Sequence, residues 1–363
     1  DMRYAFFLGA GASKSSGAPL QGELFREYFT MRQEKQKNGH GYDAEHDLER
    51  DLATLFDFLF GIDVDNADLS NVSFPTFEEA LGILDLAIMR KQSFKNFENA
   101  NYMFNADNRI EKCRQHLIYL MASILYDKLH QVHNNHEELI KSIECNGDLE
   151  NSIFISTNYD ILIDNALSDY APKNGGYSID YGFRFTNYEG IDEEKKIPLY
   201  KLHGSLNWLY CPTCDSMELT MFEKGVIRLI RPADFASQQE VLCGQCRSLK
   251  EAVIIPPTYF KDYGNYYVNQ VWHKTEEALR TVDKIFFCGY SFPDADMHIK
   301  YMLKRIETNR NKPLSVYVAN DHPGKSDEIK VAEKSRFNRF FRNNVHYLAE
   351  GFESFSNSLH RYI

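Results

Sequence analysis

The sequence lacks an excess of positive charge. Its 363 residues hold 41 Lys and Arg against 52 Asp and Glu, so the formal net charge at pH 7 is −11. Binding to nucleic acid through its phosphates requires clustered Lys and Arg. We therefore expect no direct binding of nucleic acid by this chain.

Long apolar segments, a secretion signal and internal repeats are missing as well. No stretch approaches the roughly 20 apolar residues that span a bilayer, and the first residues show no basic segment followed by an apolar signal core. These absences lead us to expect a cytoplasmic protein without membrane contact. The length allows either one large domain with insertions or two domains.

Cysteine is scarce, but its spacing is informative. Of the seven cysteines, three stand alone and four form two C-x-x-C pairs, Cys211 with Cys214 and Cys243 with Cys246. In a reducing compartment such pairs bind metal more often than they form disulfides, and four thiolates on two turns suit a structural zinc ion. We expect a small zinc ribbon over residues 205–255. The alternatives are a metal-free subdomain and a redox-active pair.

Aromatic residues are abundant at 14% of the chain, which indicates a folded protein. The segments with the strongest strand pattern are Tyr4–Leu8, Ile153–Ser156, Leu199–Leu202, Lys284–Cys288, Leu314–Ala319 and Val345–Leu348. Most are continuous apolar runs, which are typical of parallel strands buried on both faces. We expect an α/β fold, with a Rossmann-like parallel sheet core formed by residues 1–24 and 148–363.

The residues between the first two strands have a helical pattern. Apolar residues recur at helical spacing in 44–60, 77–90 and 108–145, and a capping-box pattern at Thr76 to Glu79 precedes the second of these segments. We therefore predict that residues 25–147 form a helical insertion in the sheet core.

A glycine-rich segment follows the first strand. Residues 6–19 read FFLGAGASKSSGAP, in which Gly9, Ala10, Gly11, Ala12 and Ser13 connect the strand to a helix start. Such glycines let the backbone approach a pyrophosphate. The complete G-x-G-x-x-G pattern is absent because residue 14 is lysine. A plain tight turn between strand and helix is the alternative interpretation.

Four further strands end in polar residues. These are Thr157, Asn158 and Asp160 after the second strand, His203 after the third, Gly289, Tyr290 and Ser291 after the fourth, and Asn320 after the fifth. Ligands of open α/β sheets bind beyond the carboxyl ends of the strands, so these groups are predicted to line one crevice. Each residue taken singly has a structural alternative: Asn158 could cap a helix, His203 could lie in the core, and Asn320 could form a turn.

In their order, these motifs resemble the sirtuin family. The matching residues are Gly9–Ser13 for its GAGxS entry, Thr157–Asp160 for its T-x-N-x-D, His203–Gly204 for its catalytic histidine, the two C-x-x-C pairs for its zinc ribbon, and Gly289–Ser291 and Asn320 for its late cofactor contacts. The resemblance covers residues 2–19 and about 152–350, and it implies that NAD+ is the substrate.

The resemblance also implies roles for individual residues. Asp160 would contact the nicotinamide carboxamide, and Asn158 would hold the attacking water and the ribose. His203 would bind the ribose hydroxyls and act as the base. The remaining motif residues, with Pro19, would bind the cofactor.

Two segments depart from the deacylating sirtuins. Those enzymes carry Asp-Phe-Arg after the glycine loop and Phe-Gly-Glu after the zinc ribbon, whereas this chain has Leu20-Gln21-Gly22 after Pro19, and IIPPTYF over residues 254–260. The replacements resemble the bacterial sirtuin-like branch of antiphage systems, whose members hydrolyse NAD. We therefore expect an NAD+ glycohydrolase that yields nicotinamide and ADP-ribose and depletes NAD in antiphage defence. A protein deacylase or ADP-ribosyltransferase, and a non-catalytic nucleotide-sensing module, are the alternatives.

An unrestrained NAD hydrolase would be toxic to its cell. We therefore expect homo-oligomerisation through the helical insertion, which would also close over the cofactor. A separate partner such as a HerA-type ATPase is expected for the same reason.

Overall fold

The computed structural model describes residues 2–37, 46–95, 108–129, 133–170, 177–188, 195–220, 241–256, 265–321, 324–342 and 345–363. The chain divides into two compact units, one of Asp1–Ala18, Gln131–Gly225 and Leu242–Ile363, the other of Pro19–His130 and Val226–Val241. None of the helices in the described ranges is both long and apolar enough to cross a membrane.

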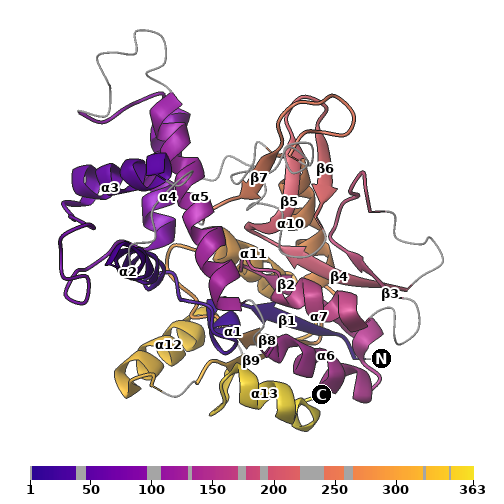
Figure 1. The fold of residues 1–363 in the computed structure, drawn as a ribbon. Coiled ribbons are helices and arrows are strands. Elements are labelled where there is room, and N and C mark those ends of the chain that lie inside the picture. The colour runs from indigo at the N-terminus through magenta and orange to yellow at the C-terminus, as the bar shows by residue number, and fades with distance from the viewer. Residues whose placement is uncertain are drawn as a thin grey trace. The chain divides into compact units, whose positions relative to one another are not determined.

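The first unit is built on a seven-stranded parallel sheet with the order β10-β9-β8-β1-β2-β4-β3 (Figure 1). Its strands are β1 (Tyr4–Leu8), β2 (Ser152–Ser156), β3 (Tyr177–Asp180), β4 (Lys195–Lys201), β8 (Lys284–Cys288), β9 (Ser315–Ala319) and β10 (Val345–Tyr347). The predicted α/β fold and its six strands are confirmed. The edge strand β3 was not predicted, because only two of its four residues are buried.

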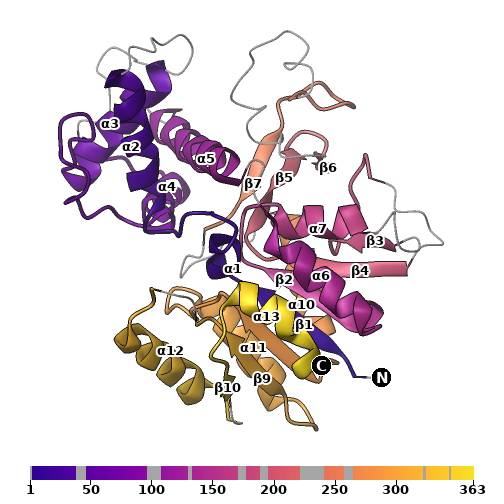
Figure 2. The ribbon, with the colours of Figure 1, turned by 60° about the horizontal axis from the view of Figure 1, so that its bottom comes forward.

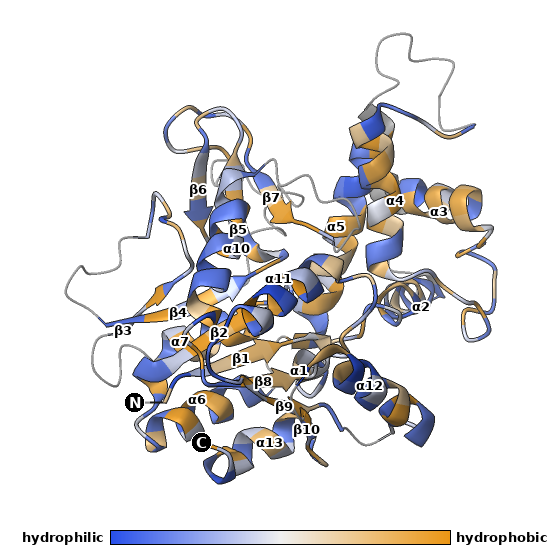
Figure 3. Ribbon diagram, turned by 180° about the vertical axis from the view of Figure 1, so that it is seen from behind, coloured by the Kyte–Doolittle hydropathy of each residue, from blue (hydrophilic) through white to orange (hydrophobic). Residues whose placement is uncertain are grey.

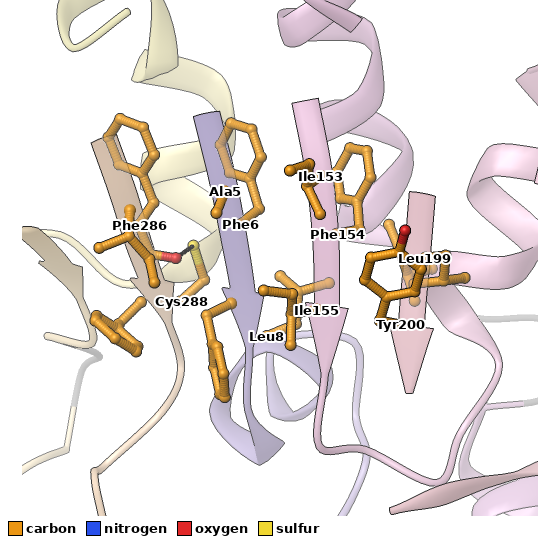
Figure 4. Packing of buried hydrophobic residues seen from close by; sticks show 14 of the residues in the cluster. Ala5, Phe6, Leu8, Ile153, Phe154, Ile155, Leu199, Tyr200, Phe286 and Cys288 are labelled. Atoms are coloured by element: carbon orange, nitrogen blue, oxygen red, sulfur yellow. Dashed lines mark hydrogen bonds between the residues drawn. The ribbon is translucent and has the colours of Figure 1, made fainter. Parts of the chain in front are cut away.

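Aromatic rings form a row across the middle of this sheet. Phe6 of β1 pairs in register with Phe154 of β2 and Phe286 of β8, and the ring centroids are 5.6 and 5.2 Å apart. Tyr317 of β9 continues the row, 5.1 Å from Phe286. Figure 4 shows the buried side chains on β8, β1, β2 and β4. These stacked contacts fix the register of the central strands and therefore the places where they end.

Helices cover both faces of the sheet (Figure 2). One face carries α6 (Asn135–Cys145), α7 (Leu162–Tyr170) and α13 (Phe352–Ser358), and the other carries α10 (Tyr266–Leu279), α11 (Met297–Thr308) and α12 (Asp327–Phe340). Adjacent residues of β8 show the division, because Phe286 contacts Phe355 of α13 whereas Phe287 contacts Phe337 of α12. Figure 3 shows the apolar character of the central strands between these layers.

A small antiparallel sheet belongs to the same unit. It contains β5 (Gly204–Cys211), β6 (Ser216–Leu219) and β7 (Glu251–Ile254) in the order β6-β5-β7. The fully buried Trp208 of β5 packs edge-on against Phe183 at 5.0 Å. These strands fall in the region expected to form a zinc ribbon. Residues 221–240 of that region lie outside the described residues.

The second unit is helical. Its helices α2 (Leu24–Lys37), α3 (His46–Phe60) and α4 (Phe77–Arg90) pack on α5 (Asn108–Leu129). The predicted capping box is confirmed, because Thr76 Oγ1 accepts from Glu79 N and Glu79 accepts from Thr76 N. The first two residues of the segment predicted over 44–60 lie outside the described residues. The segment predicted as helical over 108–145 is two helices, and the second, α6, belongs to the unit of the parallel sheet.

Candidate active site at the carboxyl ends of the parallel strands

The sheet reverses its strand order beside β1. From β1 the chain proceeds outwards to β2 and β4 on one side, and it later returns to β8 and β9 on the other. A crevice forms at such a switch point, outside the carboxyl ends of the strands, and there open α/β sheets bind their ligands. The residues that follow these strands are Gly9, Asn158, His203, Gly289 and Asn320. The fold thus brings the five predicted motifs to one edge of the sheet.

Glycines let the loops after β1 and β8 pack directly on each other. Gly9 N donates to Cys288 O at 2.9 Å, and Gly11 N donates to Gly289 O at 2.8 Å. A Cβ atom on Gly9 would lie 2.6 Å from Gly289 O, and one on Gly289, whose φ is +62°, would lie 1.9 Å from Ala12 N. Loop packing alone therefore requires these glycines, and their presence is no independent evidence for a pyrophosphate.

Asn158 joins the ends of β1 and β2. Its side-chain Nδ2 donates to Gly9 O and to Ser13 Oγ, both at 2.9 Å, and Ser13 Oγ donates to Asp160 Oδ2 at 2.6 Å. Thr157 N continues the pairing of the two strands by donating to Leu8 O at 3.0 Å. Both hydrogens of the Asn158 amide are thus used within the protein, which leaves the amide oxygen to accept a hydrogen bond from a ligand.

Asp160, rather than Asn158, accepts a hydrogen bond from the first turn of the helix that follows β2. Its Oδ1 accepts from Leu162 N at 3.1 Å, at the first residue of α7. The side chain is buried, and the loss of solvation raises the pKa of Asp160, while Lys201 and the hydrogen bonds from Ser13 and Leu162 oppose this rise. The helix-cap interpretation of Asn158 is therefore wrong, since its amide is turned towards Gly9 and Ser13.

A buried lysine at the end of β4 connects the loop after β2 to the start of β5. Lys201 Nζ donates to the backbone oxygen of Asp160 at 2.5 Å, to Asp164 Oδ2 at 3.0 Å and to Ser205 Oγ at 2.6 Å. Asn207 also donates to Asp164, at 3.2 Å. Lys201 was not among the predicted site residues, although a lysine within the apolar run Leu199–Leu202 was a signal for a buried charge.

His203 is 2% exposed and lies two residues after the end of β4. Its Nε2 is 3.9 Å from Asp296 Oδ1, and its ring centroid is 6.2 Å from that of Tyr159. The next residue, Gly204, has φ +82°, and a Cβ atom there would lie 1.9 Å from Val253 O. The pairing of β5 with β7 therefore requires the glycine that follows the histidine.

The motif after β8 makes hydrogen bonds within the protein. The Tyr290 hydroxyl donates to Asp296 Oδ2 at 2.6 Å, and both residues are buried. The backbone oxygen of Ser291 accepts from Arg336 at 2.9 Å. Asp296 was missed by the sequence analysis, because nothing in its local pattern relates it to His203.

The remaining predicted cofactor residues are Asn320, Ala10, Ala12 and Pro19. Asn320, after β9, donates through Nδ2 to the fully buried Glu333 at 2.7 Å. Ala10 and Ala12 belong to the short helix α1 (Ala10–Lys14), of which Ala12 is buried. Pro19 is the first residue of the second unit.

The four paired cysteines come together as predicted from their spacing. Their sulfur atoms all lie within 4.8 Å of one another, and Cys211 Sγ is 3.6 Å from Cys214 Sγ and 3.5 Å from Cys246 Sγ. Zn–S bonds of about 2.3 Å place tetrahedral sulfurs roughly 3.8 Å apart. Hydrogen bonds from Ser248 lower the pKa of Cys246 to about 6, and backbone hydrogen bonds from Cys246 and Gln245 lower the pKa of Cys243. This cluster is compatible with a zinc site.

Comparison with known proteins identifies the family. A family model described as a SIR2-like domain matches residues 152–340, a range that contains Asn158, His203, Asp296 and the four paired cysteines. No curated protein matches the chain. The family match covers more than half of the chain, and the protein belongs to the SIR2-like domain family, whose fold supports NAD-related chemistry.

Proposed function

We propose that the protein hydrolyses NAD+ to nicotinamide and ADP-ribose, and that it depletes NAD as an effector of bacterial antiphage defence. The observation that carries this proposal is the hydrogen-bonded set of Asn158, Ser13 and Asp160 at the switch point of a SIR2-like sheet. His203 follows the neighbouring strand β4. Together these groups offer a positioning amide, a carboxylate and a base at one sheet edge.

The chemistry of the N-glycosidic bond assigns a role to each group. This bond breaks through an oxocarbenium-like transition state as neutral nicotinamide departs. The oxygen of the Asn158 amide would orient the attacking water and the ribose. Each carboxylate oxygen of Asp160 already accepts one hydrogen bond and keeps a second lone pair, which would accept from the nicotinamide carboxamide. His203 would take the proton of the water, a contribution typically worth ~10²–10⁴ in rate.

Water is the proposed acceptor because the sequence lacks the Phe-Gly-Glu that lies beside the acyl-lysine channel of deacylating sirtuins. Of the segment that replaces it, residues 257–260 lie outside the described residues. The four cysteines Cys211, Cys214, Cys243 and Cys246 would hold one Zn²⁺ with a closed ligand set, so that the metal stabilises the ribbon.

The reaction is tested by incubating the purified protein with NAD+ and separating the products by chromatography, with and without an acyl-lysine peptide. We expect nicotinamide and ADP-ribose to form at the same rate in both samples. Turnover that requires the peptide would identify a deacylase or ADP-ribosyltransferase instead. Binding of NAD+ without turnover in either sample would identify a nucleotide-sensing module.

Restraint of the activity is a further part of the proposal. A hydrolase of free NAD is toxic, so we propose that it is held inactive in a homo-oligomer formed through the helices α2 to α5, and by a partner such as a HerA-type ATPase. Native mass spectrometry of the purified protein measures its oligomeric state directly. A monomer with full activity would contradict it.

A further inference from the structure

Asp296 occupies the N-cap of α11 without capping it. An aspartate at this position ordinarily accepts a hydrogen bond from the first turn of the helix. Here the side chain makes no cap hydrogen bond, and the connection to the helix is made by its backbone oxygen, which accepts from Lys300 N at 3.0 Å. The carboxylate instead accepts from the Tyr290 hydroxyl and lies near His203.

The two oxygens of this carboxylate face different partners. Oδ2 accepts from the Tyr290 hydroxyl at 2.6 Å, which fixes the plane of the carboxylate, and Oδ1 lies 3.9 Å from His203 Nε2. The side chains of Asp296 and His203 are 4% and 2% exposed. An opposite charge at this distance, with little solvent between, stabilises the charged form of its neighbour.

We propose that Asp296 is a positioning residue for His203, orienting the imidazole and stabilising its protonated form during the reaction. The inference rests on the proposed NAD hydrolysis. With Nε2–H directed at Asp296, the other ring nitrogen keeps a lone pair for the proton. The water oxygen forms its bond to the ribose C1′, the C1′–N bond breaks with its electron pair leaving on nicotinamide, and the proton of the water passes to His203 and then to solvent.

Other titratable groups close to this pair have partners of their own. Among the described residues, Tyr290 is bonded to Asp296, and Lys300 of α11 pairs with the exposed Asp294 at 2.7 Å. Lys201, two residues before His203, pairs with Asp164. The centroid of the Tyr159 ring lies 6.2 Å from that of His203. The His298 ring lies 6.4 Å from the ring of Trp272, whose Nε1 donates to Leu202 O.

The charge of Asp296 affects how activity depends on pH through His203. The negative charge of the Asp296 carboxylate, 3.9 Å from Nε2, favours the protonated form of His203 more than an uncharged side chain at the same position would. His203 acts as a base only when neutral, so activity rises with pH through its pKa. Asp296→Asn removes the charge and moves this acidic limb to lower pH, while the less basic imidazole slows the reaction on the plateau.

The test compares Asp296→Asn with Asp294→Asn, which makes the same change two residues earlier in the same loop, on a side chain that is 75% exposed. The acidic limb of NAD hydrolysis is expected to fall by about one pH unit or more in Asp296→Asn and to stay in place in Asp294→Asn. Histidine labelled with ¹³C at Cε1 gives the pKa of His203 directly by NMR, with its signal assigned by its loss in His203→Gln. A pKa of His203 unchanged by Asp296→Asn would overturn the proposal.

This NMR measurement needs no turnover. A parent protein without NAD hydrolysis would refute the proposed function, while the titration of His203 would still decide whether the pair exists. Should Asp296→Asn fail to fold, Tyr290→Phe provides a second test, because it keeps the charge and removes the hydrogen bond that orients it. A positioning role predicts a several-fold lower kcat with unchanged KM, and a raised KM with unchanged kcat would overturn it.

Discussion

Lys201 and Asp164 form an ion pair inside the protein, with Nζ and Oδ2 3.0 Å apart and the two side chains 0% and 3% exposed. Tyr181 donates to the second oxygen of Asp164 at 2.9 Å. Lys201 also donates to the backbone oxygen of Asp160, in the loop after β2, and to the side chain of Ser205 in β5, so it connects two segments that flank the candidate site.

Lys201→Met is expected to lower the free energy of unfolding by about 3–5 kcal/mol, because it leaves the Asp164 charge buried without its counter-charge. Adding Asp164→Asn removes that charge and keeps an oxygen for the Tyr181 hydroxyl. We expect the double variant to regain much of the stability but to remain slow in NAD hydrolysis, since the hydrogen bonds from Lys201 to Asp160 O and Ser205 Oγ are still missing. Denaturant unfolding and turnover are measured on each variant. A double variant no more stable than Lys201→Met would contradict the ion-pair account.

Gly289→Ala should destabilise the protein through a backbone clash. The new Cβ atom would lie 1.9 Å from Ala12 N, at a residue with φ +62°. Overpacking and left-handed backbone together are expected to cost about 3 kcal/mol or more. Gly324 is a matched control, because it has φ +88° and open space around its Cβ position. Equal losses of stability in both alanine variants would show that the packing of the loop after β1 on the loop after β8 does not contribute to stability.

The cysteine cluster predicts one zinc ion per chain. Elemental analysis of the purified protein should find close to one equivalent, and Cys211→Ser should lose the metal and lower the melting temperature, because metal binding is coupled to folding of the ribbon. Cys145→Ser serves as the control, since Cys145 is exposed and outside the cluster. Less than half an equivalent of zinc in folded parent protein would contradict the assignment.

His136 predicts a loss of stability in acid. The ring is buried against Phe352, with centroids 4.8 Å apart, and burial lowers the pKa of His136 from 6.5 to about 3, although the charge of Asp164 acts in the opposite direction. Below pH 6.5 the unfolded chain takes up a proton that the folded protein refuses, so stability falls as the pH drops from 6.5 towards 3. At pH 5 this proton uptake is expected to lower the free energy of unfolding by about 2 kcal/mol relative to neutral pH.

The corresponding measurement is denaturant unfolding at pH 7 and pH 5. His136→Phe should show a smaller loss between the two pH values than the parent protein, whereas a substitution of the exposed His273 should leave the loss unchanged. A His136→Phe variant that loses as much stability as the parent would show that other groups cause the acid sensitivity.

The sequence predicted the parallel sheet well because its strands are buried on both faces. Continuous apolar runs such as Tyr4–Leu8 are unfavourable on the protein surface, so they indicate buried strands. The polar residues at their ends mark the carboxyl edge of the sheet. The helix pattern could not show that α6 packs beside α7 and α13 while α5 packs with α2 to α4, because amphipathic faces do not specify their partner.

Within the site, residues adjacent to strand ends were predictable, and long-range partners were not. Asn158 and His203 stand directly beyond strands, and their position alone indicated the crevice. Asp296 reaches His203 only through the packing of the loop after β8, and the Tyr290 hydroxyl that orients it was expected at the cofactor. The clustering of the four paired cysteines could be predicted from the sequence alone, since two C-x-x-C turns can share a metal at almost any loop length.

The most direct test of the account is NAD hydrolysis by Asn158→Ala and His203→Ala, measured beside the parent on protein shown to be folded by its melting temperature. Each variant is expected to lose ~10²-fold or more in turnover. The double variant should be nearly as slow as the slower single one, because both residues act on one transition state. A well-folded single variant that retains near parental NAD turnover would contradict the central claim.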